Sequence, residues 1–321
     1  MLKALFLGLT MLLAASGTMA EAPLRVVVPF APGGGGDRMA RLLAPGLARE
    51  LGTPVIVENR PGANGIVGMQ YVRNTPGDMR VVVLASDHAT VVAPLAWGAA
   101  DYDVLRDFAM VAYVARFPYV LAVPRTSGID SPGALQASAR RQPVSVAVPA
   151  EDGLPHAIAR VLSRGGDSRI TVVPFSGGSP AAMALVSGQV TAGAIGLPSV
   201  VNLHREGKVR ILAVTGGRRS ALLPDVPTFG DTGMAGLAAS SGWSLLAPKG
   251  SRVEVDALNR ALRRVLGSSD VQDRLRALGL EPLQLTVRDS TIELRKAAAA
   301  WTKCFTGKTR DEDCIEGGNT Q

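Results

Sequence analysis

The sequence predicts two successive α/β domains, each with a doubly wound sheet, and a central ligand cleft between them. Short apolar runs alternate with helical stretches in both halves of the chain, and loops rich in glycine and serine follow several of these runs. The length of 321 residues suits two domains of ordinary size. Continuous apolar strands that alternate with helices are typical of parallel sheets covered on both faces.

The first twenty residues have the features of a signal peptide. Lys3 supplies a positive charge, an apolar run extends from Ala4 to Ala15, and Thr18 and Ala20 are small residues at the expected cleavage site. The apolar run is shorter than the roughly 20 residues that a membrane span needs, so we disfavour an uncleaved anchor. We therefore expect residues 1–20 to direct export and the mature protein to be periplasmic.

The first domain is expected over residues 21–122 together with residues 238–321. Its elements begin with a strand at Leu24–Phe30, a helix with Met39, Leu42, Leu43, Leu47 and Leu51 at helical spacing, and a strand at Pro54–Val57. A turn follows at Asn59–Gly65, and then a strand at Val81–Leu84. The C-terminal part of this domain is expected to contain a strand at Trp243–Pro248 and amphipathic helices over residues 252–303.

The second domain, over residues 123–237, repeats this construction. Ser131 is expected to cap a helix with Pro132 at its first position. Strands are expected at Tyr119–Val123, Val144–Val148, Ile170–Phe175 and Val209–Val214. One helix is expected at His156–Leu162 and another, rich in alanine, ends at Val186. The proline-rich segment at Leu223–Thr228 is expected to be irregular.

Loops that follow four of these strands are the expected ligand-binding elements. Ligands collect at the carboxyl ends of parallel strands, where the following helices present unpaired N–H groups that favour anions. Glycine lets the backbone approach a ligand closely, and serine and threonine supply hydroxyl groups. The expected ligand-binding residues are Phe30, Ala31, Gly33, Gly34, Gly35, Gly36, Asp37, Ser86, Asp87, His88, Thr90, Ala150, Glu151, Asp152, Gly153, His156, Ser176, Gly177 and Ser179.

Two enzyme classes resemble parts of this pattern and are disfavoured. The glycine-rich loop does not fit the dinucleotide fingerprint, since Arg38 or Met39 stands where its third glycine belongs, and it lacks the Gly-Lys of a P-loop. Ser86, Asp87 and His88 are adjacent, so their side chains cannot converge as a hydrolase triad does. We expect no catalytic residue and no cofactor.

The charged residues and the cysteines indicate neither a nucleic-acid site nor a metal site. The chain carries a net charge of +7, spread along its length without the aromatic interleaving of a single-strand binder. The two cysteines, Cys304 and Cys314, lie in a polar tail, where the periplasm favours a local structural disulfide. Without a histidine or a further cysteine nearby, they are a poor metal site.

Several blocks of sequence, in order, resemble one known family. They are PFAPGGGGDRMARLLAPGLARELGTPVIVENRPGANG, DYDVLRDFAMVAYVA, VPFSGGSPAAMALVSGQV, GKVRILAVTGGRRSALLPDVPTF and WSLLAPKGS. The chain resembles the tripartite tricarboxylate transporter receptors, also called Bug-type solute-binding proteins. The resemblance implies a periplasmic binding protein-like fold of the Venus flytrap kind (type II). It also implies capture of a small organic anion, a carboxylate, and its delivery to membrane permease subunits, by a protein that we expect to be monomeric.

The chain departs from the family pattern at several expected contacts. Ile195 and Gly196 stand where similar members carry an acidic residue and an asparagine, and Ile195 is the remaining expected ligand contact. Glu151 and Asp152 would raise the electrostatic cost of binding an anion. Besides transport, the sequence allows a sensor that presents its ligand-bound form to a membrane receptor and, with less support, a periplasmic hydrolase.

Overall fold

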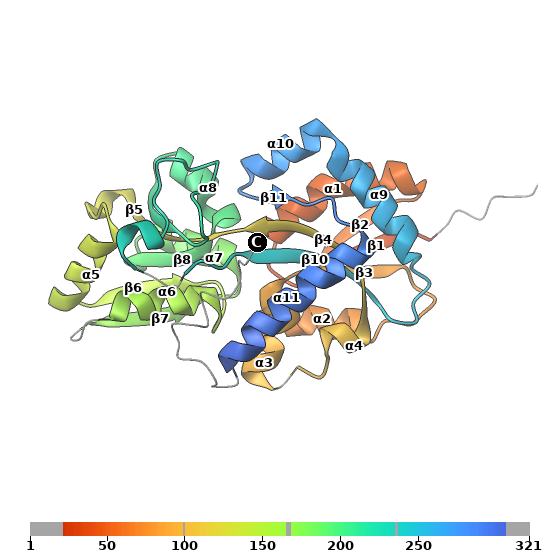
Figure 1. Ribbon diagram of the computed structural model, residues 1–321, viewed down its shortest axis with the longest axis horizontal. Helices are drawn as coiled ribbons and strands as arrows, with labels where there is room; N and C mark the ends of the chain where they lie inside the picture. Colours follow the sequence, from red (N-terminus) through yellow and green to blue (C-terminus); the bar gives the residue numbers. More distant parts are fainter. Residues whose placement is uncertain (1–21, 99, 165–167, 235–236, 306–321) are drawn as a thin grey trace, which may run out of the picture.

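The protein consists of two lobes, each built on one mixed β-sheet (Figure 1). The computed structural model describes residues 22–98, 100–164, 168–234 and 237–305. The expected signal peptide and Cys314 lie outside the described residues, as does the side chain of Cys304, so the expected disulfide falls outside this description. Among the described residues, no helix is long and apolar enough to cross a membrane.

The first sheet has the strand order β11-β4-β10-β3-β1-β2. Its strands are β1 (Leu24–Val28), β2 (Val55–Asn59), β3 (Val81–Ser86), β4 (Phe108–Phe117), β10 (Ser241–Pro248) and β11 (Glu281–Pro282). Its helices are α1 (Gly35–Leu51), α2 (Ile66–Arg73), α3 (Ala93–Trp97), α4 (Val104–Asp107), α9 (Val255–Gly267), α10 (Ser269–Ala277) and α11 (Val287–Phe305).

The second sheet has the strand order β7-β6-β8-β5-β9. Its strands are β5 (Tyr119–Pro124), β6 (Val144–Val148), β7 (Ile170–Pro174), β8 (Ala192–Gly196) and β9 (Val209–Val214). Its helices are α5 (Pro132–Arg141), α6 (Leu154–Ser163), α7 (Gly178–Val186) and α8 (Leu197–Arg205).

Both sheets contain an antiparallel strand where the sequence pattern predicts only parallel ones. Strands β1, β2 and β3 are mutually parallel, but β10 lies antiparallel between β3 and β4. In the second sheet β6, β7 and β8 are parallel, and β5 lies antiparallel between β8 and β9. β5 and β10 are the strands by which the chain enters each sheet from the other, so their direction follows from the crossing. The short edge strand β11 also pairs antiparallel, with β4.

The chain crosses between the sheets at a closely packed junction. Only Pro118 separates β4 from β5, and the return runs from β9 through the proline-rich segment into β10. Phe117, Tyr119 and Trp243 belong to one buried apolar cluster that contains residues of both sheets. The core therefore continues through the crossing, and the crossing strands fix how the two sheets lie at this point.

Local signals in the sequence match several element boundaries. The Ser131 hydroxyl accepts a hydrogen bond from the Ala134 N–H at 3.2 Å, as expected for a helix cap with Pro132 in the first turn. The run at Val144–Val148 forms β6 as expected, and β3 is buried along its whole length. The helical stretch expected over 252–303 is interrupted by β11, which pairs with β4.

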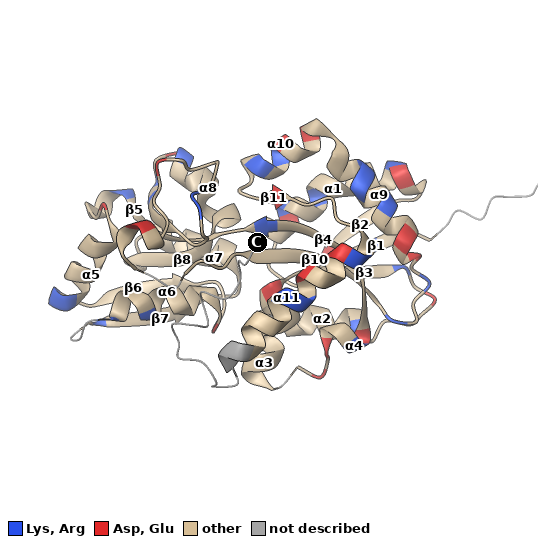
Figure 2. Cartoon of the chain, in the orientation of Figure 1, with Lys and Arg blue, Asp and Glu red and all other residues tan. Residues whose placement is uncertain are grey.

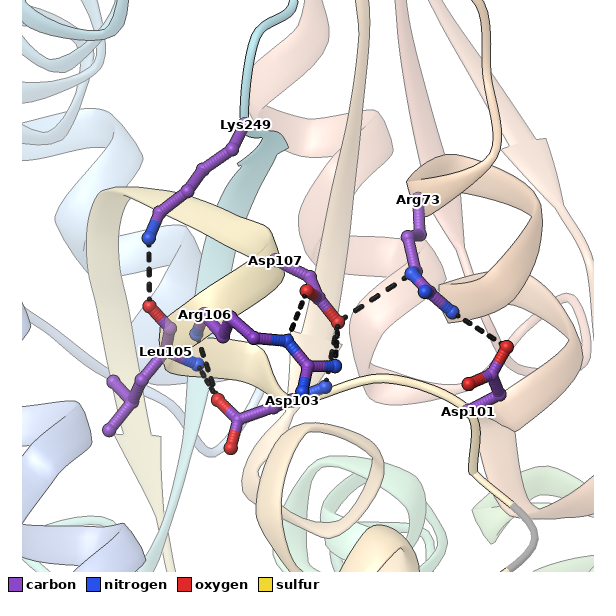
Figure 3. Close-up of polar contacts among 7 residues, drawn as sticks. All are labelled: Arg73, Asp101, Asp103, Leu105, Arg106, Asp107 and Lys249. Carbon is purple, nitrogen blue, oxygen red and sulfur yellow. Dashed lines mark hydrogen bonds and ion pairs between the residues drawn. The ribbon is translucent and has the colours of Figure 1, made fainter.

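A group of polar contacts holds the corner between α4 and β4 (Figure 3). Asp103 caps α4, because its carboxylate accepts hydrogen bonds from the Leu105 N–H at 2.9 Å and the Arg106 N–H at 2.8 Å. Lys249, which follows β10, donates to the Leu105 carbonyl at 3.1 Å. The short helix is thus tied to the end of the neighbouring strand.

Asp107 is the acidic centre of the same group, and its charge predicts an acid-dependent stability. The hydrogen bond from Arg106 is the main cause that lowers the pKa of Asp107 to about 2, and Arg73 adds to this effect. A carboxyl whose folded pKa is depressed stabilises the fold above its unfolded pKa, and this contribution is lost as the pH falls towards 2. We expect Asp107→Asn to lower the free energy of unfolding at pH 7 by up to about 1 kcal/mol. In urea titrations the difference from the unsubstituted protein should vanish near pH 2; a constant difference would contradict this origin.

Candidate functional site

A cavity lies at the junction of the two lobes, next to the crossing strands. Its walls come from the carboxyl ends of β1, β3, β6, β7 and β8 or the loops after them, from the starts of α1, α7 and α8, and from β4, β5 and β10. The lining residues are Phe30, Ala31, Gly34, Gly35, Gly36, Ser86, His88, Phe117, Tyr119, Pro149, Ala150, Gly177, Gly178, Ser179, Gly196, Pro198, Ser199 and Trp243.

About half of the expected ligand-binding residues lie on this wall. The cavity brings together residues from each of the four loops expected to form the cleft. These residues are Phe30, Ala31, Gly34, Gly35, Gly36, Ser86, His88, Ala150, Gly177 and Ser179. The other expected residues lie away from the wall, and most of them have identifiable structural contacts.

Three helices begin at the cavity without a side-chain cap. The N-caps of α1, α7 and α8 are Gly34, Gly177 and Gly196, and none of the three makes a side-chain cap hydrogen bond. The first N–H groups of a helix have no partner within it, and the helix dipole places roughly half a positive charge there. At α8 the Leu197 N–H is already bonded to the Pro118 carbonyl at 3.0 Å, so the unpaired donors come mainly from α1 and α7, one helix of each lobe. All three helices add positive potential, and no basic side chain lies on the cavity wall.

The glycines at the cavity are required for close packing between side chains and backbone. A Cβ atom on Gly36 would lie 2.4 Å from the Trp243 ring, and one on Gly35 would lie 2.7 Å from Pro198 of the other lobe. The sequence suggested that these glycines allow a ligand to approach the backbone. In the structure they also allow α1 to reach Trp243 and Pro198.

His88 combines deep burial with an unpaired ring nitrogen. It is 5% exposed, and its Nε2 atom has no hydrogen-bond partner among the described residues. Burial is the main cause that lowers the pKa of His88 to about 4, so the imidazole is neutral near pH 7. A neutral imidazole can donate or accept a hydrogen bond, but it brings no charge to the cavity.

Asp87 stands behind the cavity wall and ties the crossing strands together. Its Oδ2 atom accepts hydrogen bonds from the Tyr113 hydroxyl of β4 and from the Gly242 N–H of β10, both at 2.7 Å. Burial is the main cause that raises the pKa of Asp87 to about 6. This expected ligand contact thus lies behind the wall, bonded to the junction.

Asp37 also has structural partners. Its carboxylate accepts hydrogen bonds from the Gly33 N–H and from the Arg41 Nε–H, both at 2.9 Å. It is 4% exposed and does not line the cavity. An acid in the first turn of α1 complements the helix dipole, which is the structural interpretation that the sequence also allowed.

The acidic loop after β6 connects the lobes instead of facing the cavity. Glu151 is exposed, and the Asp152 carboxylate accepts a hydrogen bond from the Trp97 Nε1–H of α3 at 2.9 Å. Asp152 adopts a φ of 69°, and its N–H donates to His156 Nδ1 at 3.0 Å. The expected electrostatic cost to an anion is therefore smaller than the sequence suggested, because neither carboxylate lines the cavity.

The remaining expected residues also lie off the wall. Ile195 is fully buried in the apolar cluster of the second lobe, and Ser176 is exposed. Thr90 is buried in the turn of π-helix at His88–Val92. Gly33 and Gly153 both have positive φ and lie close to the cavity residues Ser179 and His88.

Sequence reasoning missed several wall residues, mainly on β4, β5, α8 and β10. Gly196 ends β8 and caps α8, and Pro198 and Ser199 lie in the first turn of that helix, the same pattern that identified the other loops. Phe117, Tyr119 and Trp243 lie on the crossing strands, and no local pattern indicates that these strands border the cleft. The missed wall residues are Phe117, Tyr119, Pro149, Gly178, Gly196, Pro198, Ser199 and Trp243.

Aromatic rings form one side of the cavity. The Trp243 ring packs edge-on against Phe30 at 5.7 Å between centroids and lies 5.9 Å from Phe117. Tyr119 is 5.6 Å from Phe117. Charged side chains lie mainly elsewhere: Figure 2 shows them on α9, α10 and α11, whereas β8 and α7 carry none. No group of acidic, histidine or cysteine side chains in the described part of the chain could hold a metal ion.

Comparisons with known proteins connect this architecture to one family. Residues 39–301 match the family described as "Tripartite tricarboxylate transporter family receptor". Protein BugT of Bordetella pertussis is 33% identical over 268 residues, which cover 82% of this chain and 82% of that protein. The match extends over both lobes.

Solved structures of similar proteins share the fold. Rpa4515 of R. palustris, solved with adipate, has a TM-score of 0.83 and 29% identity, covering 89% of this chain and 96% of that one. MatC of Rhodopseudomonas palustris, solved with bound malate, has a TM-score of 0.81 and 29% identity, covering 89% and 99%. The expected fold, that of a type II periplasmic binding protein, is confirmed.

Proposed function

Because this chain belongs to the tripartite tricarboxylate transporter receptor family, we propose that it captures a small organic anion, a carboxylate, between its lobes and delivers it to membrane permease subunits. The family is one of binding receptors, so the chain is not an enzyme. Export to the periplasm through cleavage of residues 1–20, and action as a monomer, belong to the same proposal.

The observation that carries the proposal is the meeting of three uncapped helix N-termini at one cavity. Helices α1 and α7, one from each lobe, leave their first N–H groups for a ligand. At α8 the Leu197 N–H donates to the Pro118 carbonyl at 3.0 Å and Pro198 has no N–H, so this helix contributes mainly through its dipole. Such positions favour anions, and a carboxylate can accept several N–H bonds at once. The adipate and malate bound by Rpa4515 and MatC support a carboxylate in this chain too.

The proposed domain division follows the sequence expectation except at its first boundary. The sequence assigns residues 21–122 and 238–321 to the first domain and residues 123–237 to the second. We place the first boundary at Pro118, because β5 (Tyr119–Pro124) lies in the second sheet. The crossing at Pro118 and the return into β10 are then the hinge about which the lobes close. The proposed ligand contacts are the expected residues that line the cavity, with the aromatic residues of the crossing strands added to them.

Binding is tested by thermal shift with the mature protein and a panel of mono-, di- and tricarboxylates and amino acids. A ligand at a hundred times its dissociation constant should add about 2.7 kcal/mol to the free energy of unfolding. A shift with at least one carboxylate is the expected result. If no carboxylate in the panel shifted the transition, the proposed function would lose its basis.

Delivery to a permease is tested separately from binding. Ligand-bound protein should retain permease subunits in a pull-down from detergent-solubilised native membranes, and ligand-free protein should retain fewer. Retention of a sensor receptor in place of permease subunits would favour the signalling alternative. Labelling of Ser86 or Ser176 by an acylating probe would be required for a hydrolase, and we expect neither serine to react.

The hydrogen bond between Trp97 and Asp152 should stabilise the closed arrangement of the two lobes. Trp97 lies on α3 of the first lobe and Asp152 in the second, so opening of the lobes would break this bond. We expect Trp97→Phe to weaken affinity for the ligand found in the panel by about fivefold, as befits the loss of about 1 kcal/mol. Isothermal titration calorimetry measures this change.

The matched control for Trp97 is another tryptophan of the first lobe. Trp301, on α11, packs against apolar clusters and does not line the cavity. Trp301→Phe should leave affinity unchanged. Equal affinities of the Trp97→Phe variant and the unsubstituted protein would show that the bond does not hold the lobes together.

A further inference from the structure

The loop between β6 and α6 lies beside the cavity and contacts the first lobe at two points. Ala150 lines the cavity wall, and the Asp152 carboxylate accepts a hydrogen bond from the Trp97 Nε1–H at 2.9 Å. A Cβ atom on Gly153 would lie 3.5 Å from His88 Nδ1, so the loop also packs against this residue of the first lobe. The conformation of the loop therefore links the cavity wall to the contact between the lobes.

The backbone of this loop adopts a conformation that needs support from its surroundings. Asp152 has a φ of 69°, and Gly153 has a φ of 77°. Glycine adopts a positive φ readily, whereas a residue with a side chain pays a steric cost there. Such a conformation persists only where neighbouring contacts hold it.

His156 provides this support through one hydrogen bond. It is the third residue of α6, and its Nδ1 atom accepts a hydrogen bond from the Asp152 N–H at 3.0 Å. The arrangement resembles a capping box, in which a side chain of the first helical turn reaches back to a backbone N–H that precedes the helix. The N-cap residue Gly153 makes no side-chain cap hydrogen bond. The bond to His156 thus holds in place the residue whose carboxylate binds Trp97.

The direction of this hydrogen bond determines the protonation state of His156. A backbone N–H can only donate, so the Nδ1 atom must be the unprotonated nitrogen of a neutral ring. A protonated imidazole carries a hydrogen on both nitrogens and has no acceptor. Protonation of His156 therefore removes the bond and places two donors, the Nδ1–H and the Asp152 N–H, against each other.

The charged groups around His156 act in both directions. Burial is the main cause that lowers the pKa of His156 below its ordinary value, and Arg160 of the same helix adds to this effect, whereas Asp152 and Glu151 oppose it. From the first lobe, His88 lies close enough that a charge on His156 lowers the pKa of His88 too. The closed lobes thus favour a neutral His156. Opening would expose the ring to water, which favours its protonated form.

Resting on the proposed function, we propose that His156 is a positioning residue that keeps the lobes closed around the ligand only while its imidazole is neutral, so that acidification weakens ligand capture. His156 does not line the cavity. It acts through Asp152, which it holds, and through Trp97 of the opposite lobe, which Asp152 binds.

NMR spectroscopy of the ligand-free mature protein tests this inference through its three tryptophans, Trp97, Trp243 and Trp301. The indole N–H signal of Trp97 is identified by its absence from Trp97→Phe. It should move as the pH falls from 7.5 to 5 in the unsubstituted protein and stay in place in His156→Asn, because the asparagine oxygen can accept from the Asp152 N–H but does not titrate. The Trp301 signal should stay in place in both proteins. A Trp97 signal that stays in place, or that moves alike in both proteins, would overturn the inference and leave the proposed function standing.

Titration calorimetry with malate measures the consequence for binding. At pH 7.5 His156→Asn should bind malate at least about fivefold more tightly than His156→Leu, because leucine has a similar size but no acceptor. Between pH 7.5 and 5.5 the affinity of the unsubstituted protein should fall about fivefold more than that of His156→Asn, since one proton allows at most about tenfold per pH unit. His88 is present in both proteins, so its titration does not affect this comparison.

The outcomes of the malate titrations separate the inference from the proposed function. Circular dichroism verifies that each variant is folded. Equal falls in affinity with pH, or equal affinities of the two His156 variants at pH 7.5, would overturn the inference. Failure of malate to bind any of the three proteins would count against the proposed function, and the Trp97 signal would then decide the inference by itself.

Discussion

Gly242→Ala should destabilise the protein by about 3 kcal/mol, because overpacking of a rigid core carries costs of this size. A Cβ atom on Gly242 would lie 1.9 Å from the Tyr113 hydroxyl oxygen and 2.0 Å from the ring carbon that carries it. Tyr113 is 4% exposed, and its hydroxyl is bonded to Asp87 at 2.7 Å, so the ring has little freedom to move away. Urea unfolding followed by circular dichroism measures the change.

The specificity of this effect is tested by a control and by a second substitution. A Cβ atom added to Gly133, in the first turn of α5, would have nothing within 4 Å, so Gly133→Ala should change stability by no more than about 0.5 kcal/mol. Combining Gly242→Ala with Tyr113→Leu should be less destabilising than the sum of the two single changes, because the smaller side chain relieves the overlap. Additive effects would show that the loss has another origin.

The sequence predicted the fold class well because its signals are local and repeated. Apolar runs and helix starts such as Ser131-Pro132 depend on neighbouring residues only, and they identified β1, β2, β3, β6, β7 and β9. The direction of β5 and β10 was not predictable in this way. It depends on which sheet each crossing strand joins, and strand composition does not encode that choice.

The cavity could be predicted only where its residues lie in strand-end loops. Gly34 to Gly36, Gly177 and Ser179 were found because helix starts carry a recognisable composition. Trp243 was missed as a wall residue because it lies within a strand, and its position depends on the register of β10 against β3 and β4. Conversely, Asp87 and Asp152 are polar residues in strand-end loops, as ligand-binding residues often are. Hydrogen bonds to residues distant in the sequence hold Asp87 at the junction and Asp152 between the lobes.

The adjacent residues Asp87 and His88 should make opposite contributions to the pH dependence of stability. The folded pKa of Asp87 is raised to about 6, so the folded state binds a proton that the unfolded state has lost, and stability falls as the pH rises from 4 to 6. The folded pKa of His88 is lowered to about 4, so stability rises with pH between 4 and 6.5. At about 1.4 kcal/mol per pKa unit, each contribution is roughly 3 kcal/mol, and the two nearly cancel.

Substituting either Asp87 or His88 should therefore make the contribution of the other residue to the pH dependence of stability measurable. In Asp87→Asn the amide oxygen can still accept from Tyr113 and Gly242. Only the His88 contribution then persists, so acidification from pH 7 to 4 should cost roughly 3 kcal/mol more than in the unsubstituted protein. In His88→Asn the same acidification should increase stability by a similar amount relative to the unsubstituted protein. Urea titrations at half-unit pH intervals, without ligand, measure both curves. The other acids titrate alike in all three proteins. If the three curves of stability against pH were parallel, neither Asp87 nor His88 would have the shifted pKa that its burial implies.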